Sequence, residues 1–172
     1  MAEFTGERVI PGEVDPDLWN EHFARYAFAA RLSRRKRVLD AGCGAGYGSA
    51  ELARSAARVV GVDASLEALE HAVRHYKVAN TEFLAASCAA LPFAAESFDL
   101  VVSFEVIEHM PDWQAFLEEA RRVIAPSGQF VVSTPNKDYY TGSRGTGGAN
   151  PFHHHEFTFQ EFREALRAVF PH

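Results

Sequence analysis

One short stretch constrains the fold of this chain more than any other: Arg37–Gly48, which reads RVLDAGCGAGYG. Val38 and Leu39 form an apolar run that ends in Asp40. Glycines then follow at every second position, at Gly42, Gly44, Gly46 and Gly48. A buried strand that opens into a glycine turn and then into a helix has this pattern. Glycine lets a ligand lie against the backbone, and the free N–H groups of the helix face that ligand, so the stretch predicts a binding loop.

The spacing of these glycines distinguishes between ligands. The dinucleotide fingerprint is G-x-G-x-x-G, and its last position falls on Tyr47 or Ser49, depending on the glycine from which it is counted. Neither residue is glycine, so the spacing disfavours a nicotinamide or flavin cofactor. The next predicted strand, Arg58–Asp63, ends in an acid 17 residues after Gly46, where a carboxylate can accept both ribose hydroxyls. A glycine turn without a ligand would require these features to coincide by accident.

The order acid-x-Gly-x-Gly-x-Gly resembles motif I of class I S-adenosylmethionine (SAM) methyltransferases, of the type 11/23-like group. The resemblance implies an α/β fold, with a Rossmann-like parallel sheet in strand order 3-2-1-4-5 and helices on both faces. It also implies which residues hold SAM. The methionine part is held by Gly42, Gly44, Gly46 and the region of Asp40, and the ribose is held by Asp63.

The adenine side departs from the family pattern. Members of the family carry Gly-Asp-Ala where this chain has Ala86-Ser87-Cys88, and the family's Asp accepts a hydrogen bond from the adenine amine. Ser87 can accept one too, but a hydroxyl without charge forms a weaker bond than a carboxylate. By the same resemblance, Ser87 and Cys88 lie beside the adenine and Leu91 packs on it.

Length and composition are typical of one globular domain. Residues 1–172 are expected to form a single SAM-binding domain, with an arm and a helix over 1–35 and a core over 36–172. The net charge of −6 argues against a nucleic-acid partner. No apolar run approaches the roughly 20 residues of a membrane span and no signal peptide opens the chain, so no membrane partner is expected. Cys43 and Cys88 make no disulfide framework, which indicates a cytoplasmic protein.

The segment Pro16–Leu32 has the periodicity of a helix with one apolar stripe. The stripe consists of Trp19, Phe23, Tyr26 and Ala30. Two interpretations are open. The helix packs on the sheet through this stripe, or it forms a lid over the cofactor, with Arg25 or Tyr26 reaching the carboxylate of SAM.

Strands alternate with helices along the rest of the chain, which predicts a parallel sheet covered on both faces. Further helices are expected at 47–57, 65–78, 112–124 and 159–170, the last with a capping box at Thr158 and Glu161. Further strands are expected at 80–84, 98–104 and 129–134, with a turn at 125–128 before the last of them. A glycine-rich loop at 135–156 is long enough to be a functional lid. The antiparallel strand pair that completes the family's sheet is missing after the last helix, so the core is expected to be truncated. Strand 129–134 is then an edge that a homodimer, the arm or the loop would cover.

The fourth predicted strand leads into Glu105–His109, which reads EVIEH. In a class I fold this segment lies beside the glycine loop, where ligands collect. SAM already carries an activated methyl group, so the site has to align the acceptor for in-line attack and help to remove its proton. Glu105 and His109 are the candidate bases. The alternatives are structural: Glu105 bonds the SAM amine, or His109 caps a turn.

The same segment suggests a metal site. Glu105, Glu108 and His109 share one face if the segment is helical. EVIEHM, the STPN at 133–136 and the later His-x-His are similar to small-RNA 2′-O-methyltransferases, which hold a divalent metal with two Glu and two His. The match implies the ligands Glu105, Glu108, His109 and His155. Such a set suits Mg²⁺, Mn²⁺, Fe²⁺ or Zn²⁺. Ubiquinone-pathway O-methyltransferases and bacterial methyltransferases of sugar-related substrates share parts of the pattern, and a polar lid loop is the alternative for the histidines.

These observations favour a SAM-dependent methyltransferase that moves a methyl group to a hydroxyl of a small-molecule or sugar-like acceptor. SAM is the expected cofactor, with a divalent metal as an open addition. A non-catalytic SAM-binding module, a metal-dependent 2′-O-methyltransferase of RNA, and an NAD oxidoreductase are the alternatives.

Overall fold

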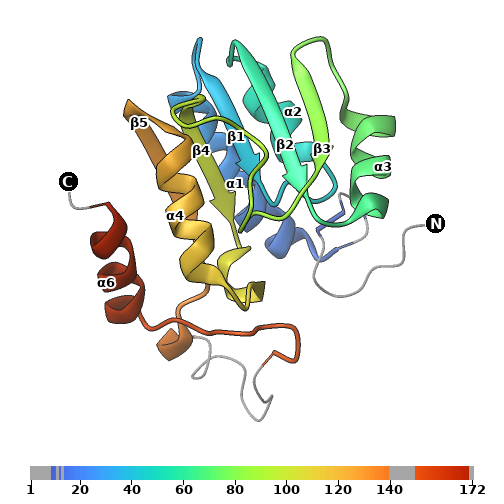
Figure 1. The fold of residues 1–172 in the computed structure, drawn as a ribbon. Helices are drawn as coiled ribbons and strands as arrows, with labels where there is room; N and C mark the ends of the chain where they lie inside the picture. The colour runs from blue at the N-terminus through green and yellow to red at the C-terminus, as the bar shows by residue number, and fades with distance from the viewer. Residues whose placement is uncertain (1–8, 11, 13, 140–149, 171–172) are drawn as a thin grey trace.

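The computed structural model describes residues 9–10, 12, 14–139 and 150–170. Five strands form one sheet in the order β3-β2-β1-β4-β5, and every pair is parallel (Figure 1). The strands are β1 Arg37–Ala41, β2 Arg58–Asp63, β3 Thr81–Ala85, β4 Phe98–Phe104 and β5 Ile124–Ser133. The helices are α1 Pro16–Leu32, α2 Tyr47–Ala53, α3 Leu66–Tyr76, η1 Ile107–His109, α4 Trp113–Val123 and α6 Phe159–Val169. The predicted α/β class and strand order are confirmed.

The boundaries agree with expectation to within two residues except at two places: α2 ends at Ala53 and not near residue 57, and β5 starts early. The strand begins at Ile124 and includes residues 125–128, which the sequence analysis assigned to a turn. The pairing with β4 explains the difference: Phe98 lies opposite Ile124 and Leu100 lies opposite Gln129, so the register shifts between them. The turn residues therefore form an irregularity within the strand, as in a β-bulge. The glycine-rich part of the predicted loop, 140–149, lies outside the described residues.

Each face of the sheet has its own hydrophobic core, because successive side chains of a strand point to opposite faces. On β1, Val38 packs with residues of α1 and α2, whereas Leu39 packs with Phe116 and Leu117 of α4. Figure 1 shows α4 in front of the sheet and α1 and α2 behind it. Sheets of this kind are buried on both faces, which is why the central strands read as continuous apolar runs. Among the described residues, none of the helices has both the length and the apolar character that crossing a membrane requires.

A buried carboxyl group joins the N-terminal helix to the sheet. Asp40 on β1 is 0% exposed, and its two oxygens accept hydrogen bonds from the Tyr26 hydroxyl at 3.1 Å and the Ser49 hydroxyl at 2.6 Å. The bond from Tyr26 brings its ring close to Gly48, where an added Cβ would lie 2.1 Å from the ring. Burial raises the pKa of Asp40 to about 7, although the bonds from Ser49 and Tyr26 act to lower it.

This pKa predicts a pH-dependent stability that Asp40→Asn removes. The folded state holds the Asp40 proton up to about pH 7, while an unfolded Asp loses it near its ordinary value of 3.8. The contribution to stability is therefore complete below about pH 4 and is lost as the pH rises through about 7, by at most about 1.4 kcal/mol per pH unit. Asparagine should flatten this decline, because the hydroxyls of Tyr26 and Ser49 can accept as well as donate.

Urea unfolding of the wild type and of Asp40→Asn between pH 4.5 and 7.5 measures the effect. Asp112→Asn alters an exposed carboxyl and serves as the control. An equal slope in wild type and Asp40→Asn would contradict the buried, protonated carboxyl.

Candidate active site

A cavity of about 460 Å³ opens at the carboxyl ends of β1, β2 and β4. Ligands collect at this edge of open parallel sheets. The predicted site residues that line the cavity are Tyr26, Gly42, Gly44, Asp63, Ser87, Cys88, Glu105 and His109. The predicted residues outside its lining are Arg25, Asp40, Gly46, Leu91, Glu108 and His155. The cavity thus brings together the glycine loop, the acid after β2 and the EVIEH segment.

The glycine loop is held by β2. Gly42 has a φ of +80°, which L side chains rarely adopt, and its N–H donates to the carbonyl of Val62 at 2.8 Å. The N–H of Gly44 donates to one oxygen of Asp63 at 2.9 Å, and the N–H of Ser65 donates to the other at 2.8 Å. Asp63 therefore shapes the loop while it lines the cavity. Each of its oxygens can accept a further hydrogen bond, so a ribose can still bind there.

Gly46 acts through packing. It precedes α2 with a φ of +90°, and an added Cβ would lie 2.5 Å from the Cβ of Ala72 on α3. A glycine here lets the start of α2 approach α3 closely.

The predicted adenine side contains one polar and one apolar residue in the cavity wall. Ser87 is exposed, and its hydroxyl accepts from the N–H of Ala89 at 3.2 Å. Burial raises the pKa of the Cys88 thiol to about 12, so it stays neutral and packs as an apolar group. Leu91 is 5% exposed and belongs to the core beneath the cavity, and its N–H donates to Glu119 at 2.7 Å.

Helix α1 both packs on the sheet and contributes to the cavity. Tyr26 is buried in the core and also lines the cavity together with His22. Burial, with a contribution from Arg25, lowers the pKa of His22 to about 4, so this ring is neutral at pH 7. Arg25 lies with its Nε 3.6 Å from Glu105 Oε1, and its buried Nη1 has no hydrogen-bond partner in the part of the chain that the structure describes. The burial of Tyr26 in the core agrees with a helix that packs on the sheet, and its place in the cavity wall agrees with a lid over the cofactor.

The EVIEH segment does not form one continuous helix. Glu105 follows β4 with a φ of +55°, and only Ile107–His109 makes a short 3-10 turn. The carboxylate of Glu105 accepts from the Ser133 hydroxyl at 2.6 Å and faces Arg25. The Glu105 side chain is therefore held by β5 and α1. Glu105, Glu108 and His109 do not share the helical face that the sequence predicted.

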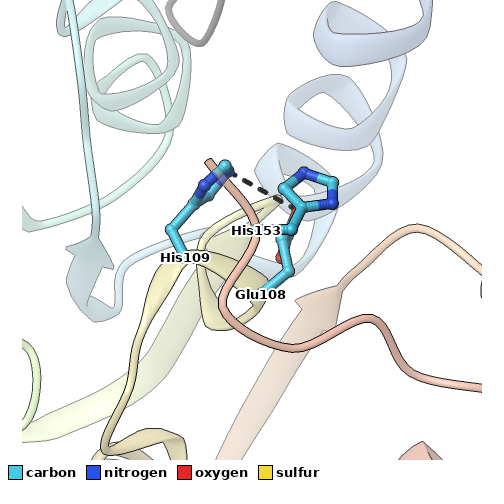
Figure 2. A group of neighbouring side chains, drawn as sticks. All are labelled: Glu108, His109 and His153. Carbon is cyan, nitrogen blue, oxygen red and sulfur yellow. Dashed lines mark ion pairs between the residues drawn. The ribbon is translucent and has the colours of Figure 1, made fainter. Parts of the chain in front are cut away.

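A second group of side chains converges beside the cavity (Figure 2). Glu108, His109 and His153 each offer one atom to a set in which all atoms lie within 4.8 Å of one another. Glu108 is 1% exposed and accepts from the Thr134 hydroxyl at 2.9 Å. Its carbonyl accepts from the N–H groups of His154 at 2.8 Å and His155 at 3.1 Å, so the segment 150–157 is tied to η1.

This group differs from the ligand set that the resemblance implies. The ring of His155 lies against Phe157 and Trp113, with centroids 4.3 Å and 5.8 Å away. His153 joins Glu108 and His109 in its place. The run of three histidines at 153–155 is the feature of the sequence that indicates an imidazole near the site. Which one does so depends on the backbone path of the loop, which no periodicity describes.

Comparisons with known proteins agree with this geometry. A family model described as a methyltransferase domain matches residues 39–132, more than half of the chain. A probable SAM-dependent methyltransferase of Mycolicibacterium smegmatis is 39% identical over 166 residues, covering 96% of this chain and 63% of the relative. A ubiquinone biosynthesis O-methyltransferase of Rhizobium rhizogenes is 38% identical over 119 residues, covering 68% of this chain and 48% of the relative. This chain thus spans 63% of the first relative and 48% of the second.

Solved structures support the fold. The YcgJ protein of Bacillus subtilis has a TM-score of 0.74 at 24% identity, covering 86% of this chain and 68% of that one. The match of the family model, together with the sheet order, confirms the family predicted from the glycine loop. The chain belongs to the methyltransferase-domain family of class I SAM-dependent methyltransferases.

Proposed function

We propose that this domain binds SAM in the 460 Å³ cavity and transfers its methyl group to a hydroxyl of a small-molecule or sugar-like acceptor. One observation carries the proposal: the cavity is lined at once by the glycine loop, by Asp63 and by His109. The first two suit the cofactor, and the third is a group that can act on an acceptor. The relative that is named a ubiquinone biosynthesis O-methyltransferase supports a hydroxyl acceptor.

SAM fits the cavity in one direction. Asp63 would accept the ribose hydroxyls, and Ser87 and Cys88 would lie beside the adenine. The methionine part would then lie over the loop that contains Gly42, Gly44 and Gly46. Its carboxylate would give the buried Nη1 of Arg25 a partner, which supports the lid interpretation of α1. Asp40 would act indirectly, by holding Tyr26 in the cavity wall.

His109 is the better placed of the two candidate bases. Glu105 is engaged by Ser133 and Arg25, whereas the Nδ1 of His109 lies 3.1 Å from the carbonyl of Phe152. A carbonyl only accepts, so Nδ1 carries the proton and Nε2 carries the lone pair. We propose that Nε2 accepts the proton of the acceptor hydroxyl. The hydroxyl oxygen attacks the methyl carbon, the carbon–sulfur bond breaks, and S-adenosylhomocysteine leaves as a neutral thioether.

The alternatives differ in what they predict for turnover. A non-catalytic module would bind SAM and methylate no acceptor. An NAD oxidoreductase would bind NAD more tightly than SAM in a titration. A 2′-O-methyltransferase of RNA would have to bind a polyanion despite a net charge of −6. Transfer of a labelled methyl group to a panel of hydroxylated small molecules, with RNA alongside, tests the first and the third alternative, and the titration tests the second.

The ribose assignment predicts that Asp63→Ala weakens SAM binding by about 2 kcal/mol, the scale for losing a charged hydrogen-bond acceptor. Asp63→Asn should lose less, since one carbonyl oxygen remains. Isothermal titration calorimetry with S-adenosylhomocysteine measures both. Glu67→Ala, an exposed acid in the first turn of α3, is the control. Unchanged affinity in folded Asp63→Ala would contradict the assignment of Asp63 to the ribose.

The role of His109 predicts that His109→Ala lowers kcat about 10²- to 10⁴-fold, the range for a positioned proton acceptor. SAM affinity should stay within about twofold. His154→Ala removes an exposed neighbouring imidazole and should leave kcat unchanged. Steady-state rates with an acceptor found in the panel give the comparison. A His109→Ala enzyme with the wild-type rate would remove this residue from the reaction.

The homodimer expected from the sequence is a separate proposal. Among the strands of the described residues, β5 pairs only with β4 and forms an edge of the sheet. Two such edges can pair across a twofold axis. Sedimentation velocity across a tenfold concentration range should show the dimer, and a monomer at every concentration would contradict it.

A further inference from the structure

Glu108, His109 and His153 have the composition and geometry of a metal site. We propose that they bind one first-row divalent metal ion at the acceptor end of the cavity. Their ligand atoms lie within 4.8 Å of one another, and atoms that share one tetrahedral ion at about 2.1 Å lie about 3.4 Å apart. A closure of about 1.4 Å, the difference between these two distances, is within the reach of side-chain rotations.

The hydrogen bonds that the two rings form through Nδ1 leave the lone pair of each histidine on Nε2. His109 donates through Nδ1 to the carbonyl of Phe152, which leaves the lone pair on Nε2, 3.9 Å from Glu108 Oε1. His153 has its Nδ1 3.2 Å from Glu156 Oε1. A carboxylate accepts, so the lone pair of His153 is also on Nε2. Metal-bound histidines almost always donate their other N–H to a carbonyl or carboxylate, as both of these do.

The lone pair of His153 Nε2 accepts a hydrogen bond from the side-chain amide of Asn150. Its Oδ1 accepts from the N–H of Phe152 at 3.0 Å, which directs its Nδ2 toward His153 Nε2 at 3.1 Å. Asn150 is therefore the donor in this contact, and His153 Nε2 is the acceptor. A metal ion would take the place of this donor, so binding includes a local shift of the Asn150 side chain.

The third ligand, Glu108, provides the negative charge. Its side chain is 1% exposed, and buried carboxylates are usually paired, hydrogen-bonded or bound to metals. The two N–H groups that tie His154 and His155 to the Glu108 carbonyl hold the His153 segment against η1. The three ligands therefore come from two segments that the backbone already fastens together.

The ligand types select the ion. One carboxylate oxygen and two imidazole nitrogens suit Zn²⁺, Mn²⁺, Fe²⁺ or Co²⁺, whereas Mg²⁺ and Ca²⁺ prefer oxygen. Three protein ligands leave coordination positions for other groups. Because His109 lines the cavity, these positions lie on its acceptor side.

An ion there would change the role of His109, because a Nε2 lone pair that coordinates the ion cannot also accept the proton of the acceptor. Such an ion would lower the pKa of an acceptor hydroxyl beside it, so that water could take up the proton. This step rests on the proposed function. Metal binding itself does not, so the two can be tested separately.

The test uses the full chain without a histidine tag, stripped of metal and titrated with Co²⁺ and Zn²⁺. We expect one ion per chain, with visible Co²⁺ absorption and saturable Zn²⁺ binding in calorimetry. Glu108→Gln, His109→Ala and His153→Ala should each weaken Zn²⁺ binding at least tenfold. His154→Ala and His155→Ala are the matched controls and should stay within about twofold. Circular dichroism checks that each variant is folded.

Two outcomes would overturn the metal site. One is the lack of saturable binding below millimolar Zn²⁺ in the wild type. The other is an affinity that depends on His155 and not on His153. Methyl transfer that persists in EDTA at the full rate would remove the ion from the reaction and leave the proposed function standing. Tight Zn²⁺ binding without turnover of any acceptor would leave the metal site standing and contradict the proposed function.

Discussion

The hydrogen bonds that the hydroxyls of Tyr26 and Ser49 donate to the Asp40 carboxyl connect three elements of the fold. Asp40 belongs to β1, Tyr26 to α1 and Ser49 to α2. Buried polar groups need partners, so each of the three side chains requires the other two. The hydrogen bond to Asp40 places the ring of Tyr26 beside Gly48 and in the cavity wall, where α1 can help to enclose a ligand.

A second carboxylate, Asp63, ties the glycine loop to β2 by accepting from Gly44 and Ser65. Asp63 thus holds the glycine loop itself, whereas Asp40 holds the helix α2 that follows the loop. The acceptor side is built differently. There the segment 150–157 bonds back to the carbonyl of Glu108, so a loop that follows the last strand completes a site begun by β4. The cofactor side is made of neighbouring strands, and the acceptor side joins residues that are more than 40 positions apart in the sequence.

The prediction was most accurate where one local pattern determines one element. The glycine spacing predicted the strand, loop and helix, and the Thr158–Glu161 capping box begins α6 as such a box predicts. It was least accurate where the pattern allows two structures. Residues 125–128 read as a turn but form an irregular part of β5, because pairing with β4 shifts register there. EVIEH read as one helical face, but the positive φ of Glu105 separates it from the 3-10 turn.

By itself the sequence determined the alternation of strands and helices and the glycine loop, because these depend on hydrophobic periodicity and on glycines at fixed spacing. The strand order followed from the resemblance of that loop to class I SAM methyltransferases. The tertiary structure alone decided which acidic and histidine side chains meet. Asp40 lies behind the loop and outside the cavity lining, and His153 rather than His155 approaches Glu108. The physical reason is that helices and strands have a period that assigns each side chain to a face, whereas residues 150–157 have none. Their side chains are directed by hydrogen bonds to η1, which exist only once the chain has folded.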